Sequence, residues 1–395
     1  MARTVLVINS GSSSIKYQLL DPDTGEVHAK GLCERIGEKE GHIAHKYQGK
    51  TTEVNEPIAD HGAGLSEILR LFDEVGPSIA ESNVIGVGHR VVQGGKYFDG
   101  PALITDEVRQ KIEELCPLAP LHNPAHLSGI DVAKKLLPDV PHVAVFDTAF
   151  FQTLPAEAST YAIDQEVAEK YEVRRYGAHG TSHRFVSGRV AELLDRSDLK
   201  QIVLHLGNGA SASAVVNGEA VDTSMGLTPL EGLVMGTRTG DIDPAVVFHL
   251  ARQANMSIDE LDTLFNKKSG LLGLCGDNDM RTVRDLADEG NEKARAALDV
   301  YLHRLVSYVG RYYAVMGGLD VIAFTAGVGE NDVDIRRELC ERLAFMGIEL
   351  DEEVNKIRGD EPRTISTPNS KITVMVVPTN EELSIAQQVM QIAQK

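Results

Sequence analysis

Two short segments of the sequence combine glycine, serine and asparagine in a pattern that suits phosphate binding. The first, NSGSSSIK, spans residues 9–16, and the second, LGNGAS, spans residues 206–211. Small residues let backbone N–H groups approach an anion, hydroxyl groups such as those of Ser12 and Ser14 add donors, and Lys16 adds a positive charge. One such segment alone is typical of an ordinary hairpin turn. Two copies in one chain indicate a duplicated nucleotide-binding core, as in a two-domain kinase.

Arg90 and Asp147 each belong to an apolar, strand-like stretch. Arg90 lies in residues 85–92, IGVGHRVV. A lone arginine is normally a surface charge or a salt-bridge partner, but an unpaired charge in an apolar strand is costly, so we expect its guanidinium group to bind a carboxylate or phosphate ligand. Asp147 directly follows residues 142–146, HVAVF, and α/β sheets bind ligands at the carboxyl ends of their strands. This position suits a residue that orients reacting groups or exchanges a proton, and it also suits a helix or turn cap.

His179 and Arg238 are both bracketed by glycines. His179 lies in residues 176–183, YGAHGTSH, where the glycines suggest close approach of a group other than a side chain. The spacing of His179 and His183 also fits zinc on a helix, although no HExxH pattern supports a metal there. Arg238 lies in residues 236–240, GTRTG, a setting that suits an arginine that meets a transferring phosphoryl group.

Two predicted helix starts are further candidates for anion binding. His122 precedes Asn123 and Pro124, which predict the N-cap and N1 positions of a helix that continues to about residue 137. His122 would either help to cap this helix or bind an anion at its positive end. The predicted strand 321–324 runs into a loop over residues 325–331, TAGVGEN, whose Gly-x-Gly pattern before a helix is also typical of nucleotide binding.

The composition limits the classes of partner and the compartment. The 395 residues include 58 acidic and 39 basic ones, and the net charge of −19 argues against nucleic acid or an anionic membrane as partner. An anionic substrate therefore needs a local basic pocket. The four cysteines are widely spaced, so we expect neither a zinc site nor disulfides. Without a signal peptide or a membrane-spanning apolar run, we expect a cytoplasmic protein.

The order of strand and helix patterns predicts an α/β protein without the two commonest nucleotide motifs. Residues 49–51, GKT, match the end of a P-loop, but Ala44 stands where the first glycine is needed. No G-x-G-x-x-G follows a strand, so a dinucleotide fingerprint is also missing. Around residues 150–155 the pattern changes to a loop, which we interpret as the crossing into a second domain.

Taken together, these motifs closely resemble the acetate and propionate kinase family, within the superfamily of actin and the sugar kinases. The resemblance covers essentially the whole chain. It rests on NSGSSSIKY at 9–17, GHRVVQGG at 88–95, FDTAFF at 146–151, YGAHGTSH at 176–183, HLGNGAS at 205–211, GTRTGDIDP at 236–244, FTAGVGEN at 324–331 and TNEEL at 379–383.

The resemblance implies a fold of two duplicated α/β domains of the actin and sugar-kinase, ribonuclease H-like type, with an active-site cleft between them. The first domain would span residues 1–150, with a final helix at 384–395 that packs back on it. The second, nucleotide-binding domain would span residues 151–383. A homodimer is also implied.

The implied reaction is reversible, Mg²⁺-dependent transfer of the γ-phosphoryl group of ATP to acetate, which gives acetyl phosphate and ADP; Mn²⁺ could replace Mg²⁺. By position, Asp147 matches the catalytic acid/base, His179 and Arg238 match transition-state stabilisers, and Asn9 and Glu381 match magnesium-associated residues. The substrate-binding set is Arg90, Val92, Leu121, His122 and Pro229. The ATP-binding set is Ser12, Ser14, Lys16, His205, Leu206, Gly207, Asn208, Gly209, Asp279, Met280, Arg281, Gly327, Val328, Gly329, Glu330 and Asn331.

Ala178 departs from the family pattern, which usually has phenylalanine before the catalytic histidine. A smaller side chain near the methyl pocket would admit a longer acyl chain, so propionate or butyrate kinase activity is the first alternative. An actin-like ATP-driven switch would need neither Arg90 nor a methyl pocket. A sugar or glycerol kinase would need polar groups where Val92, Leu121 and Pro229 stand.

Overall fold

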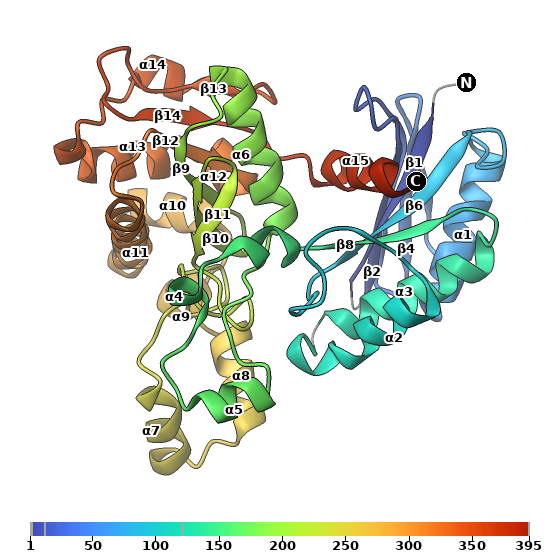
Figure 1. Cartoon of the computed structure of the whole chain (residues 1–395), viewed down its shortest axis with the longest axis horizontal. Helices are drawn as coiled ribbons and strands as arrows, with labels where there is room; N and C mark the ends of the chain where they lie inside the picture. The colour runs from blue at the N-terminus through green and yellow to red at the C-terminus, as the bar shows by residue number, and fades with distance from the viewer. Residues whose placement is uncertain (1–2, 12, 121, 394–395) are drawn as a thin grey trace. The chain divides into compact units, whose positions relative to one another are not determined.

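The computed structural model describes residues 3–11, 13–120 and 122–393, which form two compact α/β units (Figure 1). The first unit comprises Met1–Gln152 and Asn380–Lys395, and the second comprises Thr153–Thr379. Among the described residues, no helix combines the length and the apolar composition that crossing a membrane requires.

The first unit is built on an eight-stranded mixed sheet. Its central strand β1 is antiparallel to β2 and parallel to β6. Side chains alternate along β1, so Val5 and Val7 pack on one face of the sheet while Leu6 and Ile8 pack on the other. In spatial order the strands are β5 (Lys50–Val54), β4 (His42–Tyr47), β3 (Val27–Glu34), β2 (Ser14–Leu20), β1 (Thr4–Ser10), β6 (Val84–Val91), β8 (His142–Phe146) and β7 (Ala102–Leu103).

Helices cover both faces of this sheet. Helix α1 contributes Leu65, Ile68 and Phe72 to the core on the face of Leu6, and the C-terminal helix α15 contributes Ile385 and Val389 to the core on the face of Val5. The α-helices of the unit are α1 (His61–Glu74), α2 (Asp106–Glu114), α3 (Asn123–Leu136) and α15 (Glu381–Ala393), with 3-10 helices at Cys116–Leu118 and Ala149–Thr153.

The six-stranded sheet of the second unit repeats the topology of the first. The order β11-β10-β9-β12-β14 matches β3-β2-β1-β6-β8, with the same antiparallel and parallel pairings. This repeat confirms the duplicated core predicted from the two phosphate-binding patterns. The strands are β11 (Glu219–Thr223), β10 (Ala210–Val216), β9 (Lys200–Leu206), β12 (Val321–Thr325), β14 (Thr373–Val376) and β13 (Arg363–Thr364).

Two helices sandwich the second sheet. Helix α11 begins after its N-cap Asn291 and ends at Gly317, whose φ of 63° is the left-handed conformation that glycine accepts most readily. Helix α6 covers the other face with Val186 and Val190. The α-helices of the unit are α4 (Ala156–Ser159), α5 (Gln165–Lys170), α6 (Gly180–Leu194), α7 (Ala245–Gln253), α8 (Ile258–Lys267), α9 (Gly270–Cys275), α10 (Met280–Asp288), α11 (Glu292–Met316), α12 (Ala326–Asn331), α13 (Val333–Arg342) and α14 (Glu352–Asn355), with a 3-10 helix at Ala344–Met346.

The segment after β12 differs from the prediction. Residues 325–331 were expected to form a Gly-rich loop before a helix, but α12 begins at Ala326, directly after the strand. The carboxylate of Glu330 accepts a hydrogen bond from the Ala326 backbone N–H at 2.8 Å, which satisfies one donor at the start of this helix. The Gly-x-Gly pattern therefore lies within a short helix.

Candidate active site

The first unit places Arg90 and Asp147 side by side. Both residues lie at the carboxyl ends of neighbouring parallel strands, β6 and β8. Asp147 Oδ2 accepts hydrogen bonds from Arg90 Nη2 at 2.6 Å and from Arg90 Nε at 3.1 Å, and Asp147 is 1% exposed. Arg90 therefore pairs with a carboxylate of its own chain, Asp147, whereas the sequence predicted a carboxylate or phosphate ligand as its partner. Among the described residues, Arg90 Nη1 has no such partner, so one edge of the guanidinium group is not taken by Asp147.

Acidic residues at the start of α15 extend this cluster. Glu381 Oε2 lies 3.9 Å from Arg90 Nε, and Glu382 forms an ion pair with Lys16. Burial, together with the charges of Asp147 and Glu382, raises the pKa of Glu381. The Asn380 side chain caps α15 by accepting from the Leu383 backbone N–H at 3.0 Å. Glu381 and Glu382, in the first turn of α15, therefore both lie close to basic side chains of the first unit.

The backbone of Arg90 is held by helix α3. The Arg90 carbonyl oxygen is 2.6 Å from His126 Nδ1. The N-terminus of α3 corrects a sequence prediction, because His122 occupies the N-cap position without a side-chain cap bond and Asn123 is the first helical residue. The Asn123 side chain instead forms two hydrogen bonds with the backbone of Gln93, at 3.1 and 3.0 Å. Val92, the other described substrate-pocket candidate of this unit, is buried.

We predict that protonation of His126 lowers the free energy of unfolding in mild acid. Burial and the nearby Arg90 charge lower the pKa of His126 to about 3 in the folded protein, so the unfolded chain binds a proton first as the pH falls below about 6.5. The neutral, buried imidazole therefore contributes its full share to the free energy of unfolding above pH 6.5. This contribution decreases as the pH falls toward 3, and about 2 kcal/mol of it is lost at pH 5. Urea unfolding at pH 7.5 and pH 5 measures this change, and His126→Gln should reduce the difference. An unchanged difference in His126→Gln would contradict this assignment.

In the second unit, His179 is fixed by an array of hydroxyl and imidazole groups. It precedes α6 with a φ of 60°, an uncommon left-handed conformation for a residue with a side chain. Ser211 Oγ lies 2.9 Å from His179 Nδ1 and 2.7 Å from His183 Nε2. The ring of His205 stacks on that of His179 with centroids 4.3 Å apart. Both histidines of the YGAHGTSH motif thus contact one serine, and the described residues hold no group of three or more potential metal-ligating side chains.

Arg238 lies next to His179 at the second Gly-rich hairpin. A Cβ atom on Gly209 would be 3.5 Å from both Arg238 Nη1 and His179 Cε1. Arg238 Nη1 donates to the Pro229 carbonyl oxygen at 3.3 Å. Burial lowers the pKa of Arg238. No acidic side chain among the described residues forms an ion pair with Arg238, so this partly buried charge is not compensated by a carboxylate there.

A cavity of about 660 Å³ lies in the second unit and contains half of the predicted ATP-binding residues. Those that line it are Gly207, Asn208, Asp279, Met280, Arg281, Gly327, Val328 and Asn331. The others lie elsewhere: His205 and Leu206 are in β9, Gly209 is beside Arg238, and Gly329 and Glu330 are in α12 but not at the cavity wall. Ser14 and Lys16 belong to the first unit. Ser12 and Leu121 lie outside the described residues.

The cavity also has lining residues outside the predicted ATP-binding set. Gly236, the first residue of the GTRTG segment, is one of them, and a Cβ atom there would be 1.9 Å from Asn208 Oδ1, so a larger residue would displace the Asn208 side chain. Asn278, adjacent to the predicted Asp279, donates to Asn208 Oδ1 at 3.2 Å. Further along the wall are Leu271, Arg284, Asp285, Tyr301, Asp332, Val333, Asp334 and Arg358, which carry no local motif.

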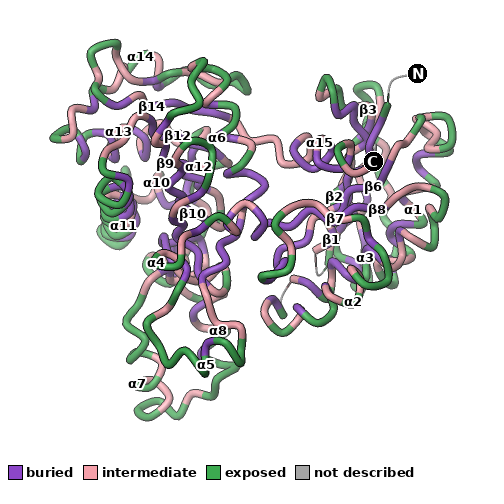
Figure 2. Tube along the Cα trace, viewed as in Figure 1, coloured by how far each residue is buried: buried purple, intermediate pink, exposed green. Residues whose placement is uncertain are grey.

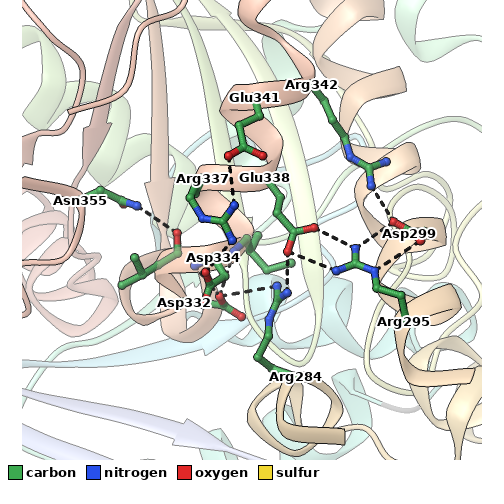
Figure 3. A network of polar contacts seen from close by, with 12 residues as sticks. Arg284, Arg295, Asp299, Asp332, Asp334, Arg337, Glu338, Glu341, Arg342 and Asn355 are labelled. Atoms are coloured by element: carbon green, nitrogen blue, oxygen red, sulfur yellow. Dashed lines mark hydrogen bonds and ion pairs between the residues drawn. The ribbon is translucent and has the colours of Figure 1, made fainter. Parts of the chain in front are cut away.

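An ion-pair network stabilises one wall of this cavity (Figure 3). Glu338 Oε1 lies 2.6 Å from Arg284 Nη1, and Glu338 Oε2 lies 2.8 Å from Arg295 Nη2. Asp299 continues the network to Arg295 and Arg342, at 2.8 and 2.7 Å. The network joins α10, α11 and α13, and it therefore holds the helix that contributes Arg281 and Arg284 to the cavity.

Comparisons with known proteins identify the family of the chain. The model of the acetokinase family matches residues 4–387. An acetate kinase from Leifsonia xyli subsp. xyli is 58% identical over 389 residues, which is 98% of this chain and 98% of that protein. Among solved structures, Porphyromonas gingivalis acetate kinase is 45% identical, with a TM-score of 0.94, and the match covers 99% of this chain and 100% of that one. A propionate kinase from Francisella tularensis subsp. tularensis is 41% identical, with a TM-score of 0.93 over 98% and 99% of the two chains. The chain therefore belongs to the acetokinase family.

Proposed function

We propose that the chain transfers the γ-phosphoryl group of ATP reversibly to acetate, which yields acetyl phosphate and ADP. The observation that carries this proposal is Arg238, a partly buried cation without an acidic partner among the described residues, placed beside His179 at a phosphate-binding hairpin. Positive charge held ready in this way stabilises the negative charge that spreads over a phosphoryl group in transit. The high identity to relatives named acetate kinase supports the same reaction.

Each unit contributes a different part of the proposed chemistry. The cavity of the second unit, lined by Gly207, Arg281 and Gly327, would hold the nucleotide, with His179 and Arg238 at the phosphoryl group. In the first unit, the Arg90 guanidinium edge not taken by Asp147 would bind the acetate carboxylate, because a carboxylate is the natural ligand of an arginine fork. Val92, Leu121 and Pro229 are the apolar residues proposed to contact the acetate methyl group. The structure describes Val92 and Pro229, while Leu121 lies outside the described residues.

The residues of the first unit also fit Mg²⁺. Asn9 and Glu381 offer oxygen ligands, which Mg²⁺ prefers, and it usually keeps waters and phosphate oxygens as further ligands. Among the described residues, the Asn9 amide has no hydrogen-bond partner, and Glu381 is a buried carboxylate with Asp147 and Glu382 nearby, a setting in which a cation would be stabilised. When bound, Mg²⁺ would neutralise phosphate charge. Mn²⁺ has the same ligand preferences and could replace it.

The proposed reaction needs no covalent bond between the protein and the phosphoryl group. An acetate oxygen attacks the γ-phosphorus while the bond from that phosphorus to the bridging oxygen breaks and ADP leaves with the electron pair. Acetate is ionised at neutral pH, so its attack needs no general base. Asp147 therefore acts by holding Arg90 in place. We propose a single in-line displacement, which inverts the configuration at phosphorus; retention in a chiral phosphate experiment would contradict it.

The assay that tests the proposal measures ADP release from MgATP with acetate, propionate, butyrate, glycerol or no acceptor, and traps acyl phosphate with hydroxylamine. Acetate-dependent ADP release with acetyl hydroxamate is expected. Propionate belongs in the assay because Ala178 is a small residue in the core with Leu206 and Leu233, and pockets discriminate one methylene by only about 1–3 kcal/mol. Equal ADP release without an acceptor would favour an ATP-driven switch.

We also propose a homodimer in which a second copy covers an apolar surface of the second unit. None of the nine residues of α7 is buried, and Phe248 is 57% exposed (Figure 2). Ile258 at the start of α8 is 83% exposed, and Val167 and Tyr171 at α5 are also exposed. Figure 1 shows α5, α7 and α8 at the lower end of this unit. Exposed apolar groups of this number are typical of interaction surfaces.

Light scattering after gel filtration is expected to give twice the mass of one chain for the wild type and a lower mass for Phe248→Asp. The new carboxylate would have to be desolvated in the interface, which is costly. Phe345→Asp, at an 82% exposed phenylalanine of the 3-10 helix Ala344–Met346, is the matched control and should remain dimeric. A monomeric wild type would refute the dimer, and a dimeric Phe248→Asp would place the interface elsewhere.

A further inference from the structure

The segment that carries Arg238 is buried although it has no regular secondary structure. It lies between β11 and α7, and residues 232–236 are all buried. Buried backbone N–H and C=O groups need hydrogen-bond partners, and here a helix or sheet cannot supply them within the segment. The contacts that hold residues 232–241 therefore decide where the Arg238 side chain lies.

Gly232 and Asp241 close this segment into a loop. The Asp241 backbone N–H donates to the Gly232 carbonyl oxygen at 2.9 Å, and the Gly232 N–H donates to Asp241 Oδ1 at 2.8 Å. Gly232 has a φ of 114°, and a Cβ atom there would lie 2.6 Å from the Ser224 carbonyl oxygen, so only glycine fits. We call this pair of residues the Gly232–Asp241 clasp. Inside the loop, the Met235 N–H donates to the Arg238 carbonyl oxygen at 3.2 Å.

Two side chains of α11 anchor the clasp. Tyr308 Oη donates to Asp241 Oδ2 at 2.8 Å, and Tyr308 is 3% exposed. Arg304 donates from Nη1 to the Gly232 carbonyl oxygen at 2.9 Å and from Nη2 to the Asp241 carbonyl oxygen at 3.1 Å. Burial and the Asp241 carboxylate raise the pKa of Tyr308, which keeps its hydroxyl group protonated as a donor. The 25-residue helix α11 packs on the sheet, so it is a rigid support for these contacts.

We propose that Asp241, Tyr308 and Arg304 are positioning residues that hold Arg238 at the site of phosphoryl transfer. This inference rests on the proposed function, in which Arg238 stabilises the transition state. None of the three side chains lines the nucleotide cavity, so we expect their loss to act on Arg238 more than on the ATP contacts, of which only Gly236 belongs to the same loop among the described residues. Misplacement of a catalytic group by about 1 Å lowers turnover by on the order of 100-fold.

The first test compares Tyr308→Phe with Tyr312→Phe. Both variants remove one buried hydroxyl group from α11, but the Tyr312 hydroxyl has no hydrogen-bond partner among the described residues. Tyr308→Phe is expected to lower kcat by about 10- to 100-fold and leave the KM for ATP nearly unchanged. Tyr312→Phe should retain wild-type kcat. Equal kcat values in the two variants would overturn the proposal.

A double-mutant cycle separates positioning from a general effect on packing. If Tyr308 acts through Arg238, Tyr308→Phe should have little further effect on kcat in the Arg238→Ala background. Effects that multiply in the double variant would overturn the proposal. Arg304→Lys is the second variant. It keeps the charge but cannot donate to the Gly232 and Asp241 carbonyl oxygens at the same time as arginine does, and it decides the outcome if Tyr308→Phe does not fold. An inactive wild type would refute the proposed function itself, whereas an active wild type with unaffected variants would refute only the positioning role.

Discussion

Replacing Arg238 by alanine is expected to reduce kcat by about 10³-fold with little change in the KM for ATP. The physical reason is that the guanidinium group serves charge that develops mainly in the transition state. Arg238 has no acidic partner among the described residues, so its removal leaves no buried carboxylate uncompensated and should not unfold the protein. The hydroxamate assay at saturating acetate, with ATP varied, measures both constants.

Arg189→Ala on the exposed face of α6 is the matched control for this experiment. Among the described residues, Arg189 pairs with Glu192 alone, one turn away at 2.9 Å, and its loss should leave kcat and both KM values unchanged. Arg238→Lys should recover part of the lost turnover, because the lysine keeps a positive charge but lacks the planar fork. Wild-type turnover in Arg238→Ala would remove Arg238 from the mechanism, and a rise confined to the KM for ATP would make it a nucleotide contact.

Replacing Arg90 by alanine should damage both activity and stability. Asp147 and Glu381 would lose their shared positive charge, and breaking a buried ion pair in this way costs about 3–5 kcal/mol of unfolding free energy. In the same variant, kcat/KM for acetate should fall by about 10³-fold, because the proposed carboxylate ligand is gone and two negative charges repel the substrate. Urea unfolding and the hydroxamate assay with acetate varied measure the two effects.

Asp147→Asn separates the contribution of the Arg90–Asp147 ion pair to stability from its contribution to acetate binding. The asparagine retains an acceptor for Arg90, so stability should fall less than in Arg90→Ala, and turnover should fall only as far as Arg90 is displaced. Arg109→Ala is the stability control, since Arg109 pairs with Asp131 at 2.8 Å at a more exposed position and should contribute much less. If Arg90→Ala kept the wild-type KM for acetate, the carboxylate-binding role would be wrong.

Local sequence patterns predicted much of the fold because they record which faces of each element are buried. The two Gly-rich hairpins follow from the glycine and small polar residues at their turns. The repeated strand order confirms the duplication inferred from those hairpins. The predicted starts of α3 and of the helix after β12 differ from the observed ones by one or a few residues. Local preferences near a helix end are weak compared with tertiary contacts such as those of Asn123 with Gln93.

The sequence by itself determined the family, the duplicated α/β architecture and the identity of most charged groups that the reaction would use. The sequence placed Arg90 within one strand and Asp147 directly after another, and the structure shows that these two strands are parallel neighbours. Their roles in the reaction stay predictions that the experiments above address.

Only the tertiary structure decided which of these groups have partners. Helix α15 follows the second unit's last strands in the chain but packs on the first sheet, and this brings Glu381 to Arg90. Tyr308 and Arg304 carry no motif, and their contact with the loop of Arg238 depends on how α11 lies on its sheet. Charge and turn preferences are properties of short segments, whereas partnership between residues far apart in the chain is set by the packing of whole elements.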